Sequence, residues 1–159
     1  MSKDEDFMKI ALEEAKKAEL IGEIPIGALV VDQNDEIIGR GHNQKESGKD
    51  PTLHAEIIAI REASKKLQNW RLNGCRLYVT LEPCPMCAGA LVNSRIEHLF
   101  IGTEDAKGGG VCSKFQIGIN EALNHQFQFT TGVLREECSE ILKSFFKVLR
   151  KNKLGLPKK

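Results

Sequence analysis

The sequence lacks any long apolar run. Nothing near residue 1 has the short hydrophobic segment of a secretory signal, and no stretch of apolar residues is long enough to span a bilayer. Its 159 residues suit one domain with a single core, and the balance of 41% hydrophobic and 28% charged residues is typical of soluble globular proteins. We therefore expect one cytoplasmic domain over residues 1–159, with no membrane partner.

A disulfide framework is also not expected. The chain has five cysteines, which is an odd number, and its other features suit the cytosol, where thiols stay reduced. In such a protein, two closely spaced cysteines indicate metal binding or catalysis. Cys84 and Cys87, three residues apart, are therefore the first candidates for a functional site.

A strong net charge is missing as well, since the formal charge at pH 7 is only +1. The two ends nevertheless differ. Residues 1–23 contain seven acids and four lysines, whereas residues 134–159 contain eight basic residues and three acids. The basic end fits either a nucleic-acid-binding arm or a solvated helix face that continues into a charged tail over residues 151–159. Charge alone favours the second interpretation, a solvated helix face, over a nucleic-acid-binding arm.

Helical and strand-like patterns alternate along the chain, which predicts an α/β layered domain with a mixed sheet. Capping-box spacing from Ser2 and apolar residues at helical intervals predict a first helix that ends near Gly22. Apolar residues from Leu134 predict a long last helix that ends near Gly155, with Phe145, Phe146 or both in the core. The other expected elements are strands at 26–31, 36–40, 76–81, 99–102 and 127–131, a helix opened by Pro51-Thr52, a short helix at 84–92 and a weaker helical stretch at 115–123.

Two motifs at helix starts supply metal ligands. Cys84 and Cys87 are three residues apart in the first turn of a helix, so both sulfurs lie on one face. The positive end of that helix favours the thiolate form, which binds metal. His54, at the start of the preceding helix, adds an imidazole, and three such ligands suit tetrahedral zinc. Because no other histidine or cysteine has comparable spacing, we predict one zinc per chain with an open fourth position, which is typical of a catalytic site.

Glu56 is the candidate proton carrier. It lies two residues after His54, so on a helix its side chain points away from that ligand and need not bind the metal. A carboxylate in this position can take a proton from zinc-bound water, whose pKa the metal lowers to roughly 7, and pass it to a leaving amine. An isolated HxE or CxxC motif is often only a helix surface or a structural zinc half-site. Their combination favours catalysis.

The motifs resemble the cytidine deaminase superfamily, whose zinc signature is H-x-E followed by P-C-x-x-C. Further segments, spread over residues 6–150, resemble its bacterial tRNA adenosine deaminase branch. The resemblance implies a three-layer α/β/α fold around a central mixed five-stranded sheet. It also implies a homodimer that deaminates adenosine to inosine at the wobble position of a tRNA anticodon stem-loop. The segments that carry it are Asp50–Glu56, Asn69–Leu72, Leu77–Cys84, Cys87–Ala90, Ser94–Ile96, Asp105–Gly109, Asn124-His125, Glu137-Cys138 and Phe145-Phe146.

The same resemblance implies roles for individual residues. His54, Cys84 and Cys87 match the zinc ligands of the family and Glu56 its proton shuttle. Asn43 matches an asparagine that hydrogen-bonds the flipped base. Asp105 and Lys107 match a loop that contacts neighbouring nucleotides, and Phe145 matches an aromatic residue near the RNA. Gly110, Val111 and Cys112 depart from the family pattern, which affects the expected loop conformation but not the chemistry, and His125 is either a substrate contact or a structural residue.

Two other functions are compatible with part of the sequence. A deaminase of a free base or nucleoside, such as guanine or cytidine, would use the same zinc chemistry. A non-catalytic, zinc-stabilised RNA-binding module would have no need of Glu56. The basic last helix and the loop with Asp105 and Lys107 favour RNA over a small substrate, because a small-molecule enzyme has no use for an extended cationic surface.

Overall fold

Within residues 2–155, the part of the chain that it describes, the computed structural model contains four helices and five strands. The helices and strands that flank the expected motifs have bounds within a few residues of the predicted ones. The elements follow one another in the order α1 (Lys3–Leu20), β1 (Gly27–Val31), β2 (Ile37–His42), α2 (Ala55–Leu67), β3 (Arg76–Leu81), α3 (Pro85–Asn93), β4 (His98–Thr103), β5 (Gln128–Thr131) and α4 (Arg135–Gly155).

The strands form one mixed sheet in the order β2-β1-β3-β4-β5. β1 is antiparallel to β2 and β3, whereas β3, β4 and β5 are parallel. The carboxyl ends of β3, β4 and β5 therefore share one edge of the sheet. β2 ends at the same edge, because its last residue, His42, pairs with Gly27 at the start of β1. We call this the carboxyl edge, and the predicted mixed five-stranded sheet is confirmed.

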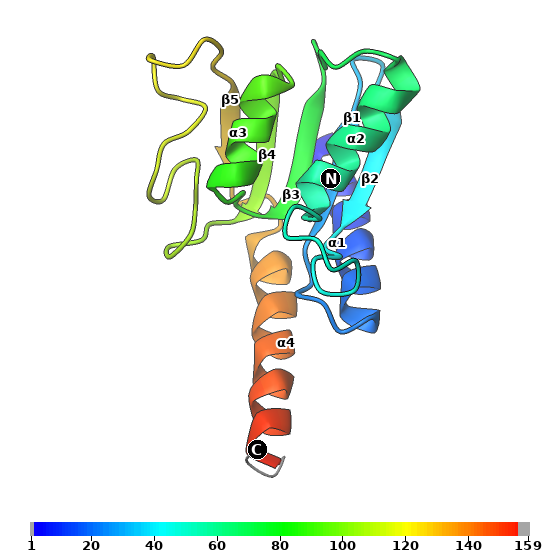
Figure 1. Ribbon diagram of the computed structural model, residues 1–159, viewed down its shortest axis with the longest axis vertical. Helices are drawn as coiled ribbons and strands as arrows, with labels where there is room; N and C mark the ends of the chain where they lie inside the picture. The colour runs from blue at the N-terminus through cyan, green and yellow to red at the C-terminus, as the bar shows by residue number, and fades with distance from the viewer. Residues whose placement is uncertain (1, 156–159) are drawn as a thin grey trace.

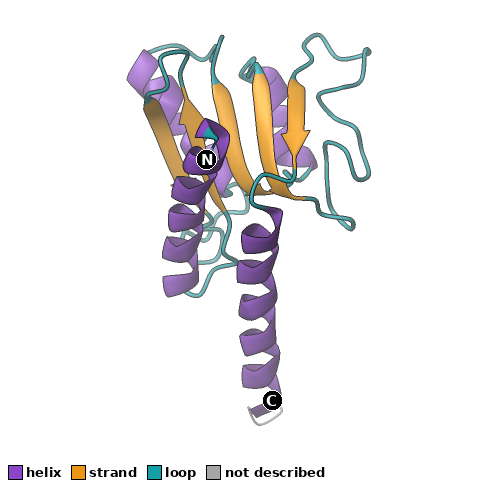
Figure 2. Ribbon diagram, turned by 180° about the vertical axis from the view of Figure 1, so that it is seen from behind, coloured by secondary structure: helices purple, strands orange, loops and turns teal. Residues whose placement is uncertain are grey.

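Helices cover both faces of the sheet and give three layers (Figures 1 and 2). On one face, α2 and α3 bury Ala59 and Leu91 against β-strand residues such as Val79. On the other face, Met8 of α1 and Cys138 of α4 pack in a second cluster. The predicted α/β/α fold is thus present. No helix within residues 2–155 combines the length and the hydropathy needed to cross a membrane.

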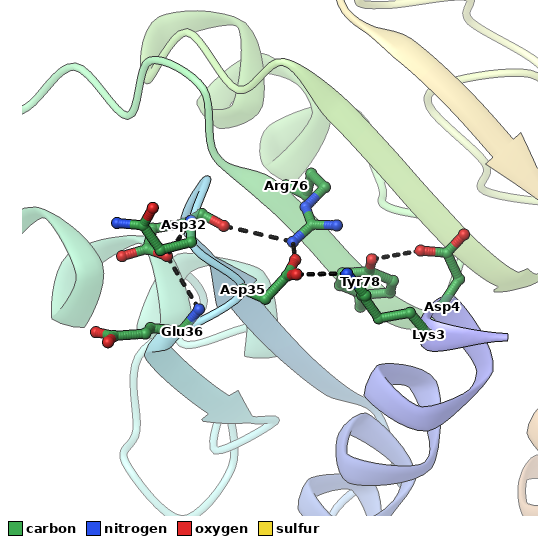
Figure 3. Close-up of polar contacts among 8 residues, drawn as sticks. Lys3, Asp4, Asp32, Asp35, Glu36, Arg76 and Tyr78 are labelled. Atoms are coloured by element: carbon green, nitrogen blue, oxygen red, sulfur yellow. Dashed lines mark hydrogen bonds and ion pairs between the residues drawn. The ribbon is translucent and has the colours of Figure 1, made fainter.

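A polar network anchors α1 and the β1–β2 turn at the edge opposite to the carboxyl edge (Figure 3). Tyr78 donates a hydrogen bond of 2.6 Å to Asp4, and Lys3 forms an ion pair of 2.5 Å with Asp35. Arg76 also pairs with Asp35. Burial and the hydrogen bond to Asp4 raise the pKa of Tyr78 far above its usual value, so its hydroxyl remains a donor. The network stabilises this end of the domain, which lies opposite the candidate site.

α4 has the expected bounds but less packing than its apolar stripe predicts. Cys138, near its start, is buried, yet Phe146 and Leu149 are each 38% exposed. Figure 1 shows that most of α4 extends beyond the carboxyl edge, so it has no sheet beneath it. At least one of Phe145 and Phe146 is expected in the core; Phe146 is exposed, and Phe145 is half-buried.

Two local predictions are also wrong. Pro51 and Thr52 lie in a turn, and α2 begins only at Ala55. Residues 115–123 form turns in place of a helix, with Phe115 more than half exposed. Of their apolar residues, Ile117 and Leu123 pack against the cluster that contains Ala59 and Leu91, which does not require helical geometry. A weak helical pattern in a long connection is easily overridden by tertiary contacts.

Candidate active site

Two helix starts meet at the carboxyl edge. His54 is the N-cap residue of α2 and Cys84 the N-cap residue of α3, and both have extended backbones. Neither side chain caps its helix, although N-cap positions normally carry a side chain that accepts a backbone N–H. Both side chains instead point toward the same place as Cys87, in the first turn of α3. The positive ends of two helix dipoles therefore face one cluster of potential ligands.

The ligand atoms have the spacing of a zinc site. Nδ1 of His54 lies 3.6 Å from the sulfur of Cys84 and 3.6 Å from that of Cys87. All three atoms lie within 4.8 Å of one another. In a tetrahedral site with Zn–N and Zn–S bonds of about 2.1 and 2.3 Å, the nitrogen and sulfur atoms are roughly 3.6 Å apart. The residues present thus fit one zinc ion per chain.

Electrostatics around the three residues also suit a cation. Hydrogen bonds that its thiolate accepts from Cys87 and from His54 lower the pKa of Cys84 to about 4. The same pairing with Cys84 and burial raise the pKa of Cys87, because two adjacent thiolates repel each other. The hydrogen bond to Cys84 raises the pKa of His54. One thiolate is therefore already favoured, and a divalent cation supplies the charge that stabilises the second.

Glu56 lies in the first turn of α2 beside this cluster. Its side chain is buried, with 4% of the residue exposed. Burial raises the pKa of its carboxyl group to about 7, and the nearby charge of Cys84 acts in the same direction. A proton carrier works best with a pKa near the working pH, and a bound cation would moderate this shift. The geometry therefore provides a buried acid–base group next to the ligand cluster, as the HxE spacing predicts.

Asn43 directly follows β2 and lies at the carboxyl edge with 5% exposure. Its Nδ2 donates to the carbonyl of Ile24 at 3.3 Å, and its Oδ1 accepts from the backbone N–H of Lys45 at 3.2 Å. These bonds fix which way the amide faces. Each end of the amide retains one further hydrogen-bonding position, so the side chain can still recognise a base.

Asp105 and Lys107 lie in the connection after β4. Asp105 Oδ1 accepts from the backbone N–H groups of Lys107 and Gly108, both at 3.1 Å. This carboxylate therefore caps its own loop. Its other oxygen, Oδ2, accepts no hydrogen bond from residues 2–155. The Lys107 side chain is exposed. The structure thus brings both residues to the rim of the carboxyl edge, where they can reach a large substrate.

Three further residues are not gathered at the ligand cluster. Phe145 lines a groove of about 450 Å³ between α4 and the end of α1, which none of the ligand residues borders. His125, at the amino end of β5, donates through Nε2 to the carbonyl of Ile96 at 2.8 Å, which favours its structural role. Trp70, a residue that the sequence would suggest packs the end of α2 against the sheet, is instead 55% exposed and lies beside the guanidinium groups of Arg71 and Arg95.

Two buried acids near the site carried no sequence-based expectation. Glu23 is 2% exposed and accepts hydrogen bonds from the backbone of Glu46 and Ser47, in the loop after Asn43. Glu82 is also 2% exposed and binds the loop that carries Asp105. Burial opposes ionisation of both, but the hydrogen bonds they accept keep their pKa values below the ordinary range. The only signal for Glu82 is an acid placed directly between a buried strand and the Pro83-Cys84 motif.

Known proteins agree with this geometry. Residues 1–103 match the cytidine and deoxycytidylate deaminase zinc-binding region. The tRNA-specific adenosine deaminase of Bacillus subtilis is 52% identical over 153 residues, which cover 96% of this chain and 94% of that protein. That of Haemophilus influenzae is 51% identical over 150 residues, which cover 94% and 87%.

Solved structures of deaminases share this fold. One from a study of A-to-I editing by tRNA:A34 deaminases at the wobble position of transfer RNA has a TM-score of 0.83 and 42% identity, covering 86% of this chain and 99% of that one. A guanine deaminase from Nitrosomonas europaea has a TM-score of 0.77 but only 26% identity, covering 91% and 85%. This chain belongs to the zinc-binding cytidine and deoxycytidylate deaminase family and, within it, groups with the tRNA-specific adenosine deaminases.

Proposed function

We propose that this protein hydrolyses adenosine to inosine at the wobble position of a tRNA anticodon. The observation that carries the proposal is identity of about half the residues with tRNA-specific adenosine deaminases over nearly the whole of both chains. The guanine deaminase from Nitrosomonas europaea shares the fold at about half that identity. A free base or nucleoside is therefore the second candidate substrate, and the presence of Glu56 beside the cluster argues against a non-catalytic module.

The reaction consumes one water and releases ammonia from C6 of the base. We assign His54, Cys84 and Cys87 as zinc ligands, and zinc supplies the nucleophile by lowering the pKa of coordinated water to roughly 7. Glu56 would take protons from the water as the water oxygen bonds to C6 and deliver them to ring nitrogen N1 and to the amino nitrogen, so that the C6–N bond breaks and ammonia leaves. Its burial suits this role, because a proton carrier shielded from solvent exchanges protons only with the reacting groups.

Recognition of the substrate uses residues around the ligand cluster. Asn43, with its amide fixed by two backbone contacts, hydrogen-bonds the base that has been turned out of the stack. Asp105 and Lys107 contact neighbouring nucleotides, the first through a ribose hydroxyl and the second through phosphate. Phe145 contacts RNA from α4, at a greater distance from the chemistry.

We propose that the enzyme is a cytoplasmic homodimer of single-domain subunits, the assembly implied by the resemblance of its motifs to the family. A dimer supplies an extended surface on which one anticodon stem-loop can contact both subunits. Sedimentation equilibrium at micromolar concentration measures this directly, and a purely monomeric species would contradict it.

Direct assay tests the proposed substrate. Wild-type protein is incubated with an anticodon stem-loop that has adenosine at the wobble position, and inosine is measured after nuclease digestion. Parallel reactions contain free adenosine, guanine or cytidine. We expect rapid inosine formation in the stem-loop and almost no turnover of the small molecules. Faster turnover of guanine than of the stem-loop would establish the second candidate instead.

A further inference from the structure

The side chain of Glu82 is a buried anion bound by the loop of residues 104–113. One of its oxygens, Oε2, accepts hydrogen bonds from the backbone N–H groups of Val111, Cys112 and Ser113 at 3.1, 2.9 and 3.0 Å. The other, Oε1, accepts from the backbone N–H of Asp105 at 3.1 Å and from the Ser113 hydroxyl. Three consecutive N–H groups that converge on one oxygen form an anion-binding nest. Here the protein provides its own anion.

The loop is also packed directly against the segment that carries a metal ligand. The backbone N–H of Gly110 donates to the carbonyl of Pro83 at 2.7 Å. A Cβ atom at Gly110 would lie 2.8 Å from the carbonyl carbon of Cys84, and one at Gly109 would collide with the Glu82 carboxyl group. Neither collision is relieved by a flexible surface chain, since the first involves backbone and the second a buried carboxylate. The loop and the ligand segment are therefore held as one unit.

An ionised carboxylate matches this set of five donors, because both of its oxygens act only as acceptors. Its two oxygens offer about four lone-pair positions and no hydrogen, whereas a glutamine at this position would turn an NH₂ group toward one set of donors. If its oxygen kept the nest at residues 111–113, its nitrogen would face the N–H of Asp105. The glutamine change thus selectively disturbs the Asp105 end of the loop while the nest can remain.

We propose that Glu82 is a positioning residue, which fixes the loop bearing Asp105 and Lys107 against the ligand segment and thereby sets affinity for the nucleotides that flank the target base. This inference rests on the proposed function for its RNA contacts, but not for the positioning itself. Glu82 touches neither the ligand atoms nor the base, so its effect should appear in substrate affinity and not in the chemical step.

The test compares Glu82→Gln with Ser113→Ala, which removes one of the five bonds, and with Glu14→Gln as a matched control. Glu14 is equally buried, at 3% exposure, but lies on α1 and pairs with Lys17. Amide hydrogen exchange should be accelerated by about tenfold or more at residue 105 in Glu82→Gln, with a smaller change at residues 111–113 and none in α2 and α3. Ser113→Ala should change the same amides less, and Glu14→Gln should leave them as in wild type.

Kinetics on the anticodon stem-loop supply the second measurement. In Glu82→Gln, KM should rise about tenfold, as expected when hydrogen bonds to a charged group are removed, while kcat and zinc content stay near those of wild type. Unchanged exchange at residue 105 would overturn the positioning role. A fall in kcat with loss of zinc would make Glu82 a support of the metal site alone.

The two proposals fail separately. If wild-type protein does not deaminate the stem-loop, the proposed function is wrong, and the exchange rates alone then decide whether Glu82 positions the loop. If Glu82→Gln does not fold, Ser113→Ala decides the matter, because it leaves the carboxylate and the nest in place. A KM and exchange rates for Ser113→Ala equal to those of wild type would then overturn the inference.

Discussion

The ligand cluster and the rim of the site are built in different ways. His54, Cys84 and Cys87 lie at the starts of two helices whose remaining turns pack on the sheet, so regular structure fixes the ligand atoms. At the rim, the loop of residues 104–113 is held largely by one carboxylate, and the outer part of α4 projects past the sheet (Figure 1). The rigid cluster is thus suited to catalysis, which needs a fixed geometry of the ligand atoms. The rim is suited to discrimination between substrates.

Loss of a ligand should have the largest effect. Cys87→Ala removes one of three ligands, so zinc content should fall well below one per chain, activity should disappear and the thermal midpoint should drop, because metal binding stabilises the folded state. Elemental analysis and differential scanning fluorimetry measure these effects. Cys75→Ala is the control, since Cys75 is a buried thiol outside the cluster. Full zinc occupancy in Cys87→Ala would contradict the ligand assignment.

Glu56→Ala separates the metal from the chemistry. The variant should keep its zinc and its thermal midpoint but lose turnover by about 10³–10⁴-fold, the upper part of the range for a general acid–base group. Glu62→Ala, an exposed acid on the same helix, should behave as wild type. Steady-state rates on the stem-loop decide this prediction, and a loss of less than about tenfold would be too small for the role.

At the rim, Asp105→Asn should alter selectivity and leave zinc unchanged. Asparagine retains an oxygen that can cap Lys107 and Gly108, so the loop keeps its shape while the negative charge is removed. The preference for the RNA stem-loop over the matching DNA hairpin should narrow by about tenfold, the value of one charged hydrogen bond to a ribose hydroxyl. Asp32→Asn tests a similar cap in the β1–β2 turn and should change nothing. An unaltered RNA-to-DNA ratio would leave Asp105 with the capping role alone.

The smallest effect is expected at the end of the chain. Lys151 and Lys153 are exposed on α4, while Lys158 and Lys159 lie outside the described residues. Removal of residues 151–159 should leave the fold intact and flatten the salt dependence of tRNA binding. The log–log slope should fall by about 0.7 for each single-strand phosphate that the tail neutralises in the full-length protein. Replacement of Lys65 and Lys66, exposed at the far end of α2, serves as the control. An unchanged slope after truncation would show that the tail is only solvated.

The sequence predicted the bounds of helices and strands better than the tertiary contacts that these elements make. The five strands, α1 and α3 follow from short-range patterns of apolar residues, turn residues and caps, and they appear close to their expected bounds. Patterns could not show where the sheet ends, so the stripe of α4 was assigned to the core although Phe146 is exposed. The same limit applies to residues 115–123, where Ile117 and Leu123 pack against the core without forming a helix.

For the site, the sequence by itself determined the chemistry. The spacing of Cys84 and Cys87, and of His54 and Glu56, fixes ligand types and their faces within one helical turn, which is a local property of the chain. Only the tertiary structure decided that both helix starts meet at one edge, with His54 Nδ1 3.6 Å from each sulfur. It alone showed the contacts of Glu82, because this buried carboxylate has its hydrogen-bond partners 23 to 31 residues away in the sequence. Such long-range partners depend on how strands are ordered in the sheet, which no local spacing encodes.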